Sequence, residues 1–354
     1  MKSSYLRPTN FIFGFKAKKL INKNEAKSLF GLDDVAFASI EILKRDSLIS
    51  NKLKISEITI NNCSEENFND LKKLSIKKNF FLNLDFYNPQ IIGVLNVTPD
   101  SFSDGGKFMN SESAIIHVKN MINAGATIID IGGESTRPGA LTIDSSEEIK
   151  RIDDIIKLIK KNFPKQLISL DTRKSKVMKF GVENNVDLFN DVSALDYDDA
   201  SVEVVKESKK PIILSHSQGN PENMQVNPNY DNVLLDIYDY FENKINFLIN
   251  NKGISENQII IDPGIGFGKT LEHNLQLISK ISLFHTLGYP VMIGPSRKSF
   301  IGRIMNDNNT LNRLGGTLAA VLYAYQQGIQ IFRLHDINEA KQALKVYSQF
   351  LIQE

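Results

Sequence analysis

Short apolar runs alternate with longer stretches of helical periodicity from residue 90 to the end of the chain. The runs are rich in Ile, Val and Leu without a polar alternation, which is typical of parallel strands buried on both faces. Eight such runs are present, at residues 91–97, 127–131, 167–170, 187–189, 211–214, 258–261, 291–293 and 329–334. The pattern therefore predicts eight buried parallel strands.

The stretches between these runs repeat apolar residues at helical spacing. The clearest predicted helices are residues 114–124, 147–161, 234–250, 275–287, 315–327 and 338–351. Eight strands that alternate with helices over residues 89–354 predict a (β/α)8 TIM barrel, an α/β fold. A doubly wound sheet is the alternative, but it would need fewer strands or a topological switch point.

The first 88 residues have a different character. Gly14 and Gly31 are their only glycines, and basic residues outnumber acidic ones there, whereas acidic residues are slightly in excess afterwards. Apolar positions alternate at residues 34–42 and 54–60, and an amphipathic stretch follows at residues 67–74. These patterns predict a small α+β N-terminal module at residues 1–88, followed by the barrel at residues 89–354.

Composition narrows the classes of protein that fit. Of the 354 residues, 42% are hydrophobic and 23% are charged, which indicates a globular chain with a core. The formal net charge of +1 argues against a nucleic-acid partner and gives no support for a membrane partner. Cys63 is the only cysteine, which excludes an intramolecular disulfide and a multi-cysteine zinc site. Since neither a signal peptide nor a membrane-spanning apolar run is evident, we expect a cytoplasmic protein.

Polar residues gather where the predicted strands end. One such residue could simply cap the next helix, but polar residues at eight strand ends are hard to explain as eight caps. In a barrel these ends meet around one mouth, where active sites are built. The residues are Asn96, Asp130, Asp171, Asn190, His216, Asp262, Lys298, Arg333 and His335.

This polar set suits a flat, nitrogen-rich heterocycle next to a polyphosphate. Carboxylate and amide oxygens accept from ring N–H groups, and Lys298 can donate to a carbonyl or ring nitrogen. Positive charge at the rim and a neutral oxygen ligand could hold a polyphosphate with its Mg²⁺. The rim charges are Arg137, Lys298, Arg333 and His335, and the oxygen ligand is Asn96. Neither GxxxxGK[ST] nor GxGxxG follows a strand, so we infer neither ATP nor NAD.

Several long motifs resemble dihydropteroate synthase, a pterin-binding TIM-barrel enzyme of folate biosynthesis. They are GVLNVTPDSFSDGGKF at 93–108, DIGGESTRPG at 130–139, DPGIGFGKTLEHN at 262–274, GPSRKSFIG at 294–302 and RLHD at 333–336. The resemblance covers residues 90–354. It implies a transferase that condenses 6-hydroxymethyl-7,8-dihydropterin pyrophosphate with para-aminobenzoate, giving 7,8-dihydropteroate and pyrophosphate. It also implies Mg²⁺ as cofactor, a homodimer and inhibition by sulfonamides.

The same resemblance assigns roles to individual residues. The pterin is assigned to Asp130, Asp171, Asn190, Asp262 and Lys298. The pyrophosphate is assigned to Asn96, Thr136, Arg333 and His335, with Mg²⁺ on Asn96. The para-aminobenzoate pocket is assigned to Phe102, Thr136, Arg137, Pro138, Phe267, Ser296 and Ser299. Catalysis is assigned to Lys298, Asp171, Asp262, Thr136 and Arg137. Since the pterin ring can delocalise charge at its exocyclic methylene, we expect an SN1-like displacement in which the pyrophosphate leaves first.

Some residues depart from the family pattern or carry a plainer interpretation. His216 stands between Ser215 and Ser217, where the family usually shows methionines, so that face of the pocket is expected to be more polar. Arg173 is interpreted as a surface residue, and Glu134 as a brace for its loop. His117, His273 and His285 are interpreted as surface or core residues rather than ligands.

The N-terminal module resembles an extension found on some α-proteobacterial homologues, through YLRPTNFIFG at 5–14 and VAFASIEILKRD at 35–46. We interpret it as a packing or docking appendage without catalytic residues.

Two other functions remain open. One is a methyltetrahydrofolate-dependent methyltransferase of the same pterin-binding fold, which would need no pyrophosphate clamp at 296–299 and 333–335. The other is a non-catalytic pterin-binding protein, which loss of Arg333, His335 or the loop at Thr136 and Arg137 would have favoured. These residues are present.

Overall fold

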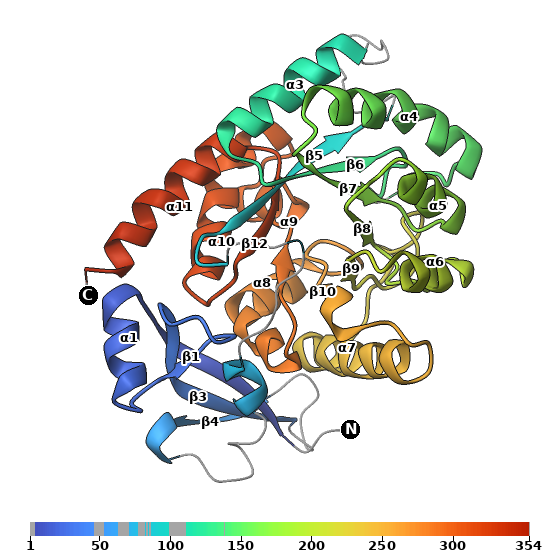
Figure 1. Cartoon of the computed structure of the whole chain (residues 1–354). Coiled ribbons are helices and arrows are strands. Elements are labelled where there is room, and N and C mark those ends of the chain that lie inside the picture. The colour runs from blue at the N-terminus through green and yellow to red at the C-terminus, as the bar shows by residue number, and fades with distance from the viewer. Residues whose placement is uncertain are drawn as a thin grey trace.

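The computed structural model describes residues 4–45, 53–62, 71–76, 82, 84, 86–98, 111–137 and 139–353. It consists of an N-terminal module and a barrel (Figure 1). Cys63 and two predicted site residues, Phe102 and Pro138, lie outside the described residues. None of the helices within the described ranges is long and apolar enough to cross a membrane.

Eight parallel strands form the barrel, as the apolar runs predict. They pair in the order β10-β9-β8-β7-β6-β5-β12-β11. A parallel bridge from Ile261 in β10 to Val291, just before β11, joins the two ends of this order. This closure confirms the TIM barrel and excludes the doubly wound sheet. The strands are β5 (Gln90–Asn96), β6 (Ile128–Gly132), β7 (Leu167–Asp171), β8 (Leu188–Asp191), β9 (Ile212–Ser215), β10 (Ile259–Asp262), β11 (Met292–Ile293) and β12 (Ile331–Leu334).

Helices surround the strands (Figure 1). They are α3 (Ser111–Ala124), α4 (Ser145–Asn162), α5 (Ser175–Glu183), α6 (Ala200–Ser208), α7 (Val233–Asn250), α8 (Leu271–Ser279), α9 (Ser299–Met305), α10 (Leu314–Tyr325) and α11 (Ile337–Leu351). Side-chain caps start several of them: Asp144 accepts from Ser146 N, and Asn232 accepts from Leu235 N. The prediction of one helix at residues 275–287 was wrong, because α8 ends at Ser279 and a 3₁₀ helix, η5 (Ile281–Leu287), follows. Two further 3₁₀ turns are η4 (Glu256–Gln258) and η6 (Thr310–Arg313).

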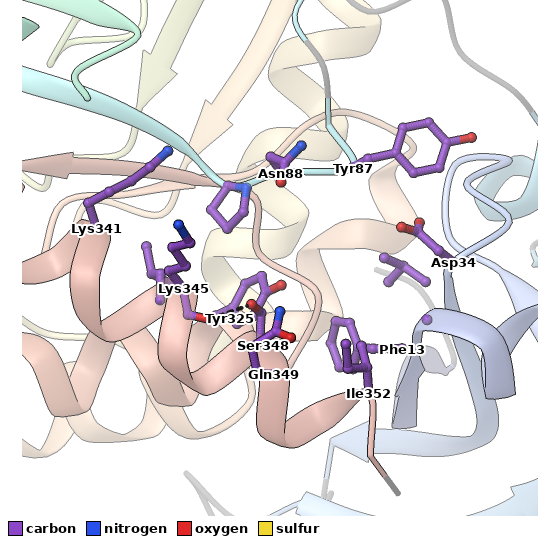
Figure 2. A pocket seen from close by; sticks show the side chains of 14 residues that line it. Phe13, Asp34, Tyr87, Asn88, Tyr325, Lys341, Lys345, Ser348, Gln349 and Ile352 are labelled. Atoms are coloured by element: carbon purple, nitrogen blue, oxygen red, sulfur yellow. Dashed lines mark hydrogen bonds between the residues drawn. The ribbon is translucent and has the colours of Figure 1, made fainter.

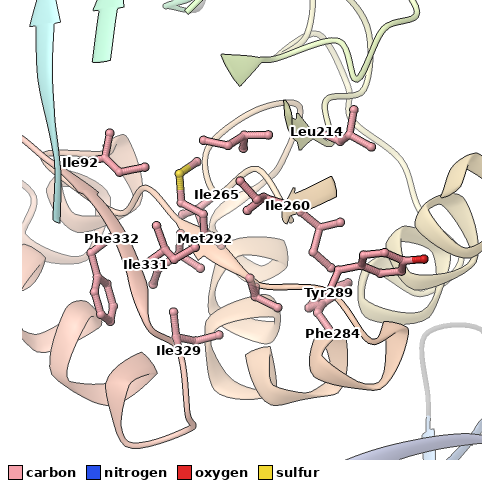
Figure 3. Packing of buried hydrophobic residues seen from close by; sticks show 14 of the residues in the cluster. Ile92, Leu214, Ile260, Ile265, Phe284, Tyr289, Met292, Ile329, Ile331 and Phe332 are labelled. Carbon is pink, nitrogen blue, oxygen red and sulfur yellow. The ribbon is translucent and has the colours of Figure 1, made fainter. Parts of the chain in front are cut away.

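Aliphatic and aromatic side chains fill the space inside and around the strands (Figure 3). Ile92, Leu214, Ile260 and Met292 come from four different strands and are at most 1% exposed. Burial of this kind is the main favourable contribution to folding.

The N-terminal module is an antiparallel sheet with one helix. β3 (Val35–Arg45) is central, with β1 (Tyr5–Phe13) on one side and both β2 (Lys27–Ser28) and β4 (Leu53–Thr59) on the other. Helix α1 (Gly14–Asn22) follows β1, and the 3₁₀ turn η1 (Ile60–Asn62) follows β4. The alternation at 34–42 and 54–60 predicted β3 and β4, but the sequence analysis missed β1 and α1. The predicted amphipathic stretch at 67–74 lies partly outside the described residues, and residues 71–75 are helical.

The module packs on segments that lead into the amino ends of β11 and β12. Phe11 and Phe30 place their rings 6.0 and 5.8 Å from the ring of His285 in η5. Phe13 lies 5.6 Å from Tyr325 at the end of α10, ring centroid to ring centroid. The main hydrophobic core extends from the module into the barrel. The module therefore covers the end of these strands that is opposite to the polar residues.

A second contact joins the module to α7. Tyr5 is fully buried, and its hydroxyl donates to Asp239 at 2.8 Å. Arg45 donates to Asp236 at 2.6 Å and to Asp239 at 2.9 Å. These bonds tie β1 and β3 to the first turns of a barrel helix.

Candidate active site

A charged floor lies at the carboxyl ends of β6, β7 and β12. Arg333 donates from Nε to Asp130 Oδ2 at 2.6 Å and from Nη2 to Asp171 Oδ2 at 2.7 Å. Asn190 Nδ2 donates to the same Asp130 oxygen at 3.1 Å. Three of the residues predicted to bind the pterin, Asp130, Asp171 and Asn190, are thus gathered around the guanidinium group of Arg333. Arg333 itself lies with the floor, whereas the sequence analysis expected its charge at the rim.

Burial perturbs this floor. It raises the pKa of Asp171 to about 7, and the charge of Arg333 opposes that shift. Asp130 is fully buried, and its Oδ1 has no hydrogen-bond partner in the part of the chain that the structure describes. A buried oxygen without a partner is costly unless a ligand supplies a donor.

Asp262 is positioned by the loop that follows β10. Its Oδ1 accepts from the backbone N–H of Gly264 at 2.8 Å, and its Oδ2 accepts from Ser215 Oγ at 3.2 Å. Burial raises the pKa of Asp262 despite these donors. Ser215 thus makes this face polar, as its departure from the family pattern predicts.

Gly264 is required where this loop approaches β9. Its φ is +70°, and a Cβ there would lie 2.0 Å from the carbonyl oxygen of His216. Any side chain would collide with backbone as well as adopt a strained conformation.

Lys298 reaches the same space from the end of β11. Its Nζ lies 3.6 Å from the centre of the Phe267 ring, a cation–π contact. Burial and the neighbouring charge of Arg333 lower the pKa of Lys298 to about 8, against the opposing charges of Asp262 and Asp171. The predicted pterin ligands therefore share one electrostatic environment.

Lys269 is a buried residue of the site that was not predicted from the sequence. It is 2% exposed, and its Nζ lies 3.1 Å from His216 Nδ1 and donates to the carbonyl of Phe267 at 2.8 Å. Burial lowers the pKa of Lys269 to about 7. Its position at the end of the glycine-rich motif at 262–269 was the sequence feature that could have identified Lys269 as part of the site. Lys269 links the His216 backbone to the loop that carries Phe267.

Ser296 and His335 form a polar pair at the ends of β11 and β12. Ser296 Oγ lies 3.0 Å from His335 Nδ1 and accepts from His335 N at 3.2 Å. Burial and the charges of Arg333 and Arg297 lower the pKa of His335 to about 3. This lowered pKa favours the neutral imidazole, so it argues against the positive charge expected of His335 from the sequence. Arg297 pairs with Asp336 through two nitrogens and thereby anchors both loops.

Asn96, the predicted metal ligand, lies half-buried at the carboxyl end of β5. Its Oδ1 and the Oδ2 of Asp171 each lie 3.7 Å from the point where a side chain on Gly132 would begin. Asn96 therefore faces the same floor as Asp171. Within the described ranges, no cluster of three or more His, Cys, Asp or Glu side chains could hold a metal ion.

The loop after β6 is anchored at its base by a buried ion-pair network. Glu134 accepts from Arg173 Nε at 2.9 Å and from Lys174 Nζ at 2.7 Å, and Lys174 also donates to Glu148 at 2.7 Å. This confirms Glu134 as a brace. The interpretation of Arg173 as a surface residue was wrong: it is 3% exposed.

The remaining predicted residues lie nearer to solvent. Beyond the braced base of the loop, Thr136 is half-buried and Arg137 is exposed. Ser299 is exposed at the start of α9, and Phe267 is half-buried. The structure thus separates a buried floor from an open rim. His285 is a core residue, as expected, and the side chain of His273 takes part in the N-terminal cap of α8.

The chain matches the family described as "Pterin binding enzyme" over residues 92–335, and it belongs to that family. Its relatives there are dihydropteroate synthases. The enzyme of Escherichia coli (strain K12) is 41% identical over 264 residues, which cover 75% of this chain and 92% of that one. The Yersinia pestis enzyme, solved in a sulfonamide drug complex, has a TM-score of 0.71 and 39% identity, covering 75% of this chain and 96% of that one. The Xanthomonas albilineans enzyme, solved with 4-aminobenzoic acid, has a TM-score of 0.70 and 36% identity, covering 75% and 94%.

Proposed function

We propose that this chain condenses 6-hydroxymethyl-7,8-dihydropterin pyrophosphate with para-aminobenzoate to give 7,8-dihydropteroate and pyrophosphate. The observation that carries the proposal is the floor in which Arg333 joins Asp130 and Asp171, with Asp262 and Lys298 beside it. Its relatives, which are transferases of folate biosynthesis, favour this reaction over the methyltransferase and non-catalytic alternatives.

The floor suits the donor-rich edge of a pterin ring. Asp130 Oδ1 is a buried acceptor that needs a donor, and Asp262 and Asn190 add further oxygen atoms. Lys298 can donate to a ring nitrogen or carbonyl. Because these groups come from several rigid strands, they hold the ring in one orientation.

The chemical step is a displacement at the exocyclic methylene carbon. The carbon–oxygen bond breaks, and its electron pair leaves with the pyrophosphate while the ring delocalises the positive charge. The amine of para-aminobenzoate then forms the new carbon–nitrogen bond and loses a proton. The protein's part is to orient both substrates and to stabilise the departing anion, a role that we assign to Arg333 and His335.

Mg²⁺ fits the oxygen donors at the end of β5. Mg²⁺ prefers hard oxygen ligands and is usually held by few protein groups together with substrate phosphates. Asn96 would supply the amide oxygen, because its Oδ1 faces the floor beside Asp171. When bound, the ion would neutralise charge on the pyrophosphate.

The rim would receive para-aminobenzoate. Phe267 offers a ring face, Lys298 a nearby charge, and Thr136 and Arg137 stand on the loop braced by Glu134. Ser296 and Ser299 complete the described part of the proposed wall. Sulfonamides, which mimic para-aminobenzoate, would bind there.

The proposal includes a homodimer and a cytoplasmic location. Tyr323 on α10 and both Val346 and Phe350 on α11 are 48–62% exposed, which supports association through these helices. The single cysteine is consistent with a reducing compartment.

The test is a coupled assay for pyrophosphate release. Release should require both substrates and Mg²⁺, and a sulfonamide should raise the KM for para-aminobenzoate without lowering the maximal rate. Pyrophosphate release that is independent of para-aminobenzoate, or methyl transfer from methyltetrahydrofolate, would contradict the proposal.

A further inference from the structure

A cavity of about 490 Å³ lies between the N-terminal module and the barrel, remote from the active site. The module contributes Phe13, Asp34 and Val35, and α11 contributes Lys341, Leu344 and Lys345 (Figure 2). Cavities of 300–1,000 Å³ at domain interfaces are typical of small-molecule sites. The family match begins at residue 92, so one wall of this cavity lies outside the part that the family shares.

Positive charge lines one side of the cavity. Lys341 and Lys345 are four residues apart on α11, so they share one helical face. Figure 2 shows both side chains rising from α11 on the side near Asn88. Within the described residues neither ammonium group takes part in an ion pair. Two adjacent lysines suit a phosphate group, which carries up to two negative charges.

An acceptor lines the other side. Figure 2 shows the Asp34 carboxylate and the Tyr87 ring across the cavity from the two lysines. Tyr325 lies close enough for the charge of Asp34 to add to burial in raising the pKa of that hydroxyl to about 12. A carboxylate at this place can accept from ring N–H or amino groups.

The space between the two polar sides is apolar. Phe13, Val35, Pro89 and Leu344 line it, and Phe13 and Leu344 are at most 5% exposed. Such a lining favours a flat aromatic ring.

We propose that this cavity binds a heteroaromatic phosphate of the size of a purine nucleoside monophosphate. The phosphate lies against Lys341 and Lys345, and the ring, bearing N–H donors, lies over Phe13 with its donors toward Asp34. The inference does not depend on the reaction at the active site.

The experiment measures binding of GMP to the full chain by calorimetry, with guanosine and inorganic phosphate as separate arms. GMP should bind, and each half alone should bind at least tenfold more weakly. The double variant Lys341→Met/Lys345→Met should weaken GMP binding at least tenfold. Asp34→Asn should weaken GMP binding but leave that of inorganic phosphate unchanged.

Two controls separate this cavity from other places where GMP could bind. Lys119→Met changes an exposed lysine on the neighbouring α3 and should leave GMP binding unchanged. Asp262→Asn alters the pterin floor and should also leave it unchanged. GMP binding that is lost in Asp262→Asn but kept in the double lysine variant would overturn the proposal, because the nucleotide would then occupy the active site. A dissociation constant weaker than about 1 mM would overturn it as well.

Discussion

At the carboxyl ends of the strands, Arg333 lies between two buried carboxylates and Asp130 keeps an oxygen without a partner. At the amino ends of β11 and β12, the module instead presses Phe11 and Phe30 against the neutral ring of His285. The first region keeps polar groups in unfavourable surroundings, and the second buries apolar surface. The comparison indicates that the residues for chemistry and the residues for stability are separated along the barrel axis.

Because the N-terminal module packs at the end of the barrel opposite to the active site, it can be large without disturbing that site. Its hydrogen bonds and ring contacts reach η5, α7 and the end of α10, and none of those described reaches Asp171, Asp262 or Lys298. Changes at the two ends should therefore have different consequences, and four measurements can break or sharpen this separation.

The largest expected effect is the loss of Lys298. Lys298→Ala removes a half-buried donor that shares the floor with Asp262 and Asp171, so kcat/KM for dihydropteroate formation should fall by about 10²–10³-fold. Steady-state kinetics measure this fall, and thermal unfolding should show no loss of stability. Near-normal turnover of the variant would contradict the role assigned to Lys298. A large fall in its thermal stability would contradict the separation of chemistry from stability.

His285 gives the next largest effect, on stability rather than activity. Burial lowers the pKa of His285 to about 4, below its ordinary value of about 6.5, so the unfolded chain binds a proton more readily. The stability from this residue is complete above about pH 6.5 and is lost as the pH falls toward 4, by about 3 kcal/mol.

Denaturant unfolding of the wild type and of His285→Gln between pH 7 and 4 measures this contribution. The variant should lose less stability on acidification than the wild type. Burial also lowers the pKa of the more exposed His117, so the control His117→Gln should change the pH dependence in the same direction but less than His285→Gln does. Equal pH dependence in all three proteins would show that His285 does not titrate in this way.

A smaller effect is expected on the alkaline limb of the pH–rate profile. The pKa of Lys298 is about 8 in the free protein, so its charged fraction declines above that pH, and kcat/KM should fall about tenfold per pH unit. In Lys298→Arg the guanidinium stays charged, and the limb should disappear even if the rate is lower. If kcat/KM of Lys298→Arg still falls at alkaline pH, another group such as Lys269 causes that fall.

The smallest effect is expected at the contact between the module and α7. Tyr5→Phe keeps the buried ring but removes the bond to Asp239, which Arg45 still pairs, so the free energy of unfolding should fall by about 1 kcal/mol. Tyr323→Phe is the matched control, because that hydroxyl is exposed. A change in kcat/KM for Tyr5→Phe would show that the module also positions the active site.

The barrel was predictable from the sequence because its strands are continuous apolar runs. Less of the module was predictable: Pro8 and the left-handed Asn10, with φ of 51°, interrupt the alternation that would have indicated β1. The break between α8 and η5 was equally hidden, since apolar positions continue through both elements.

The residue types of the candidate site were visible in the motifs, but their surroundings were not. Arg173 pairs with the buried carboxylate of Glu134, which stands 39 positions away in the chain. His335 is neutral because burial and two arginines act on it together, which follows only from the folded arrangement. Charge states of this kind depend on distances in space that spacing along the chain does not contain.

The ring of strands is joined least firmly between β10 and β11. β11 has only two residues, and the bridge from Ile261 to Val291 is isolated. η5, on which the module packs, leads directly into this joint, and Ser282 there donates to the Pro8 carbonyl at 2.9 Å. The N-terminal segment therefore holds, through this hydrogen bond, the element that leads into the weakest joint of the strand ring.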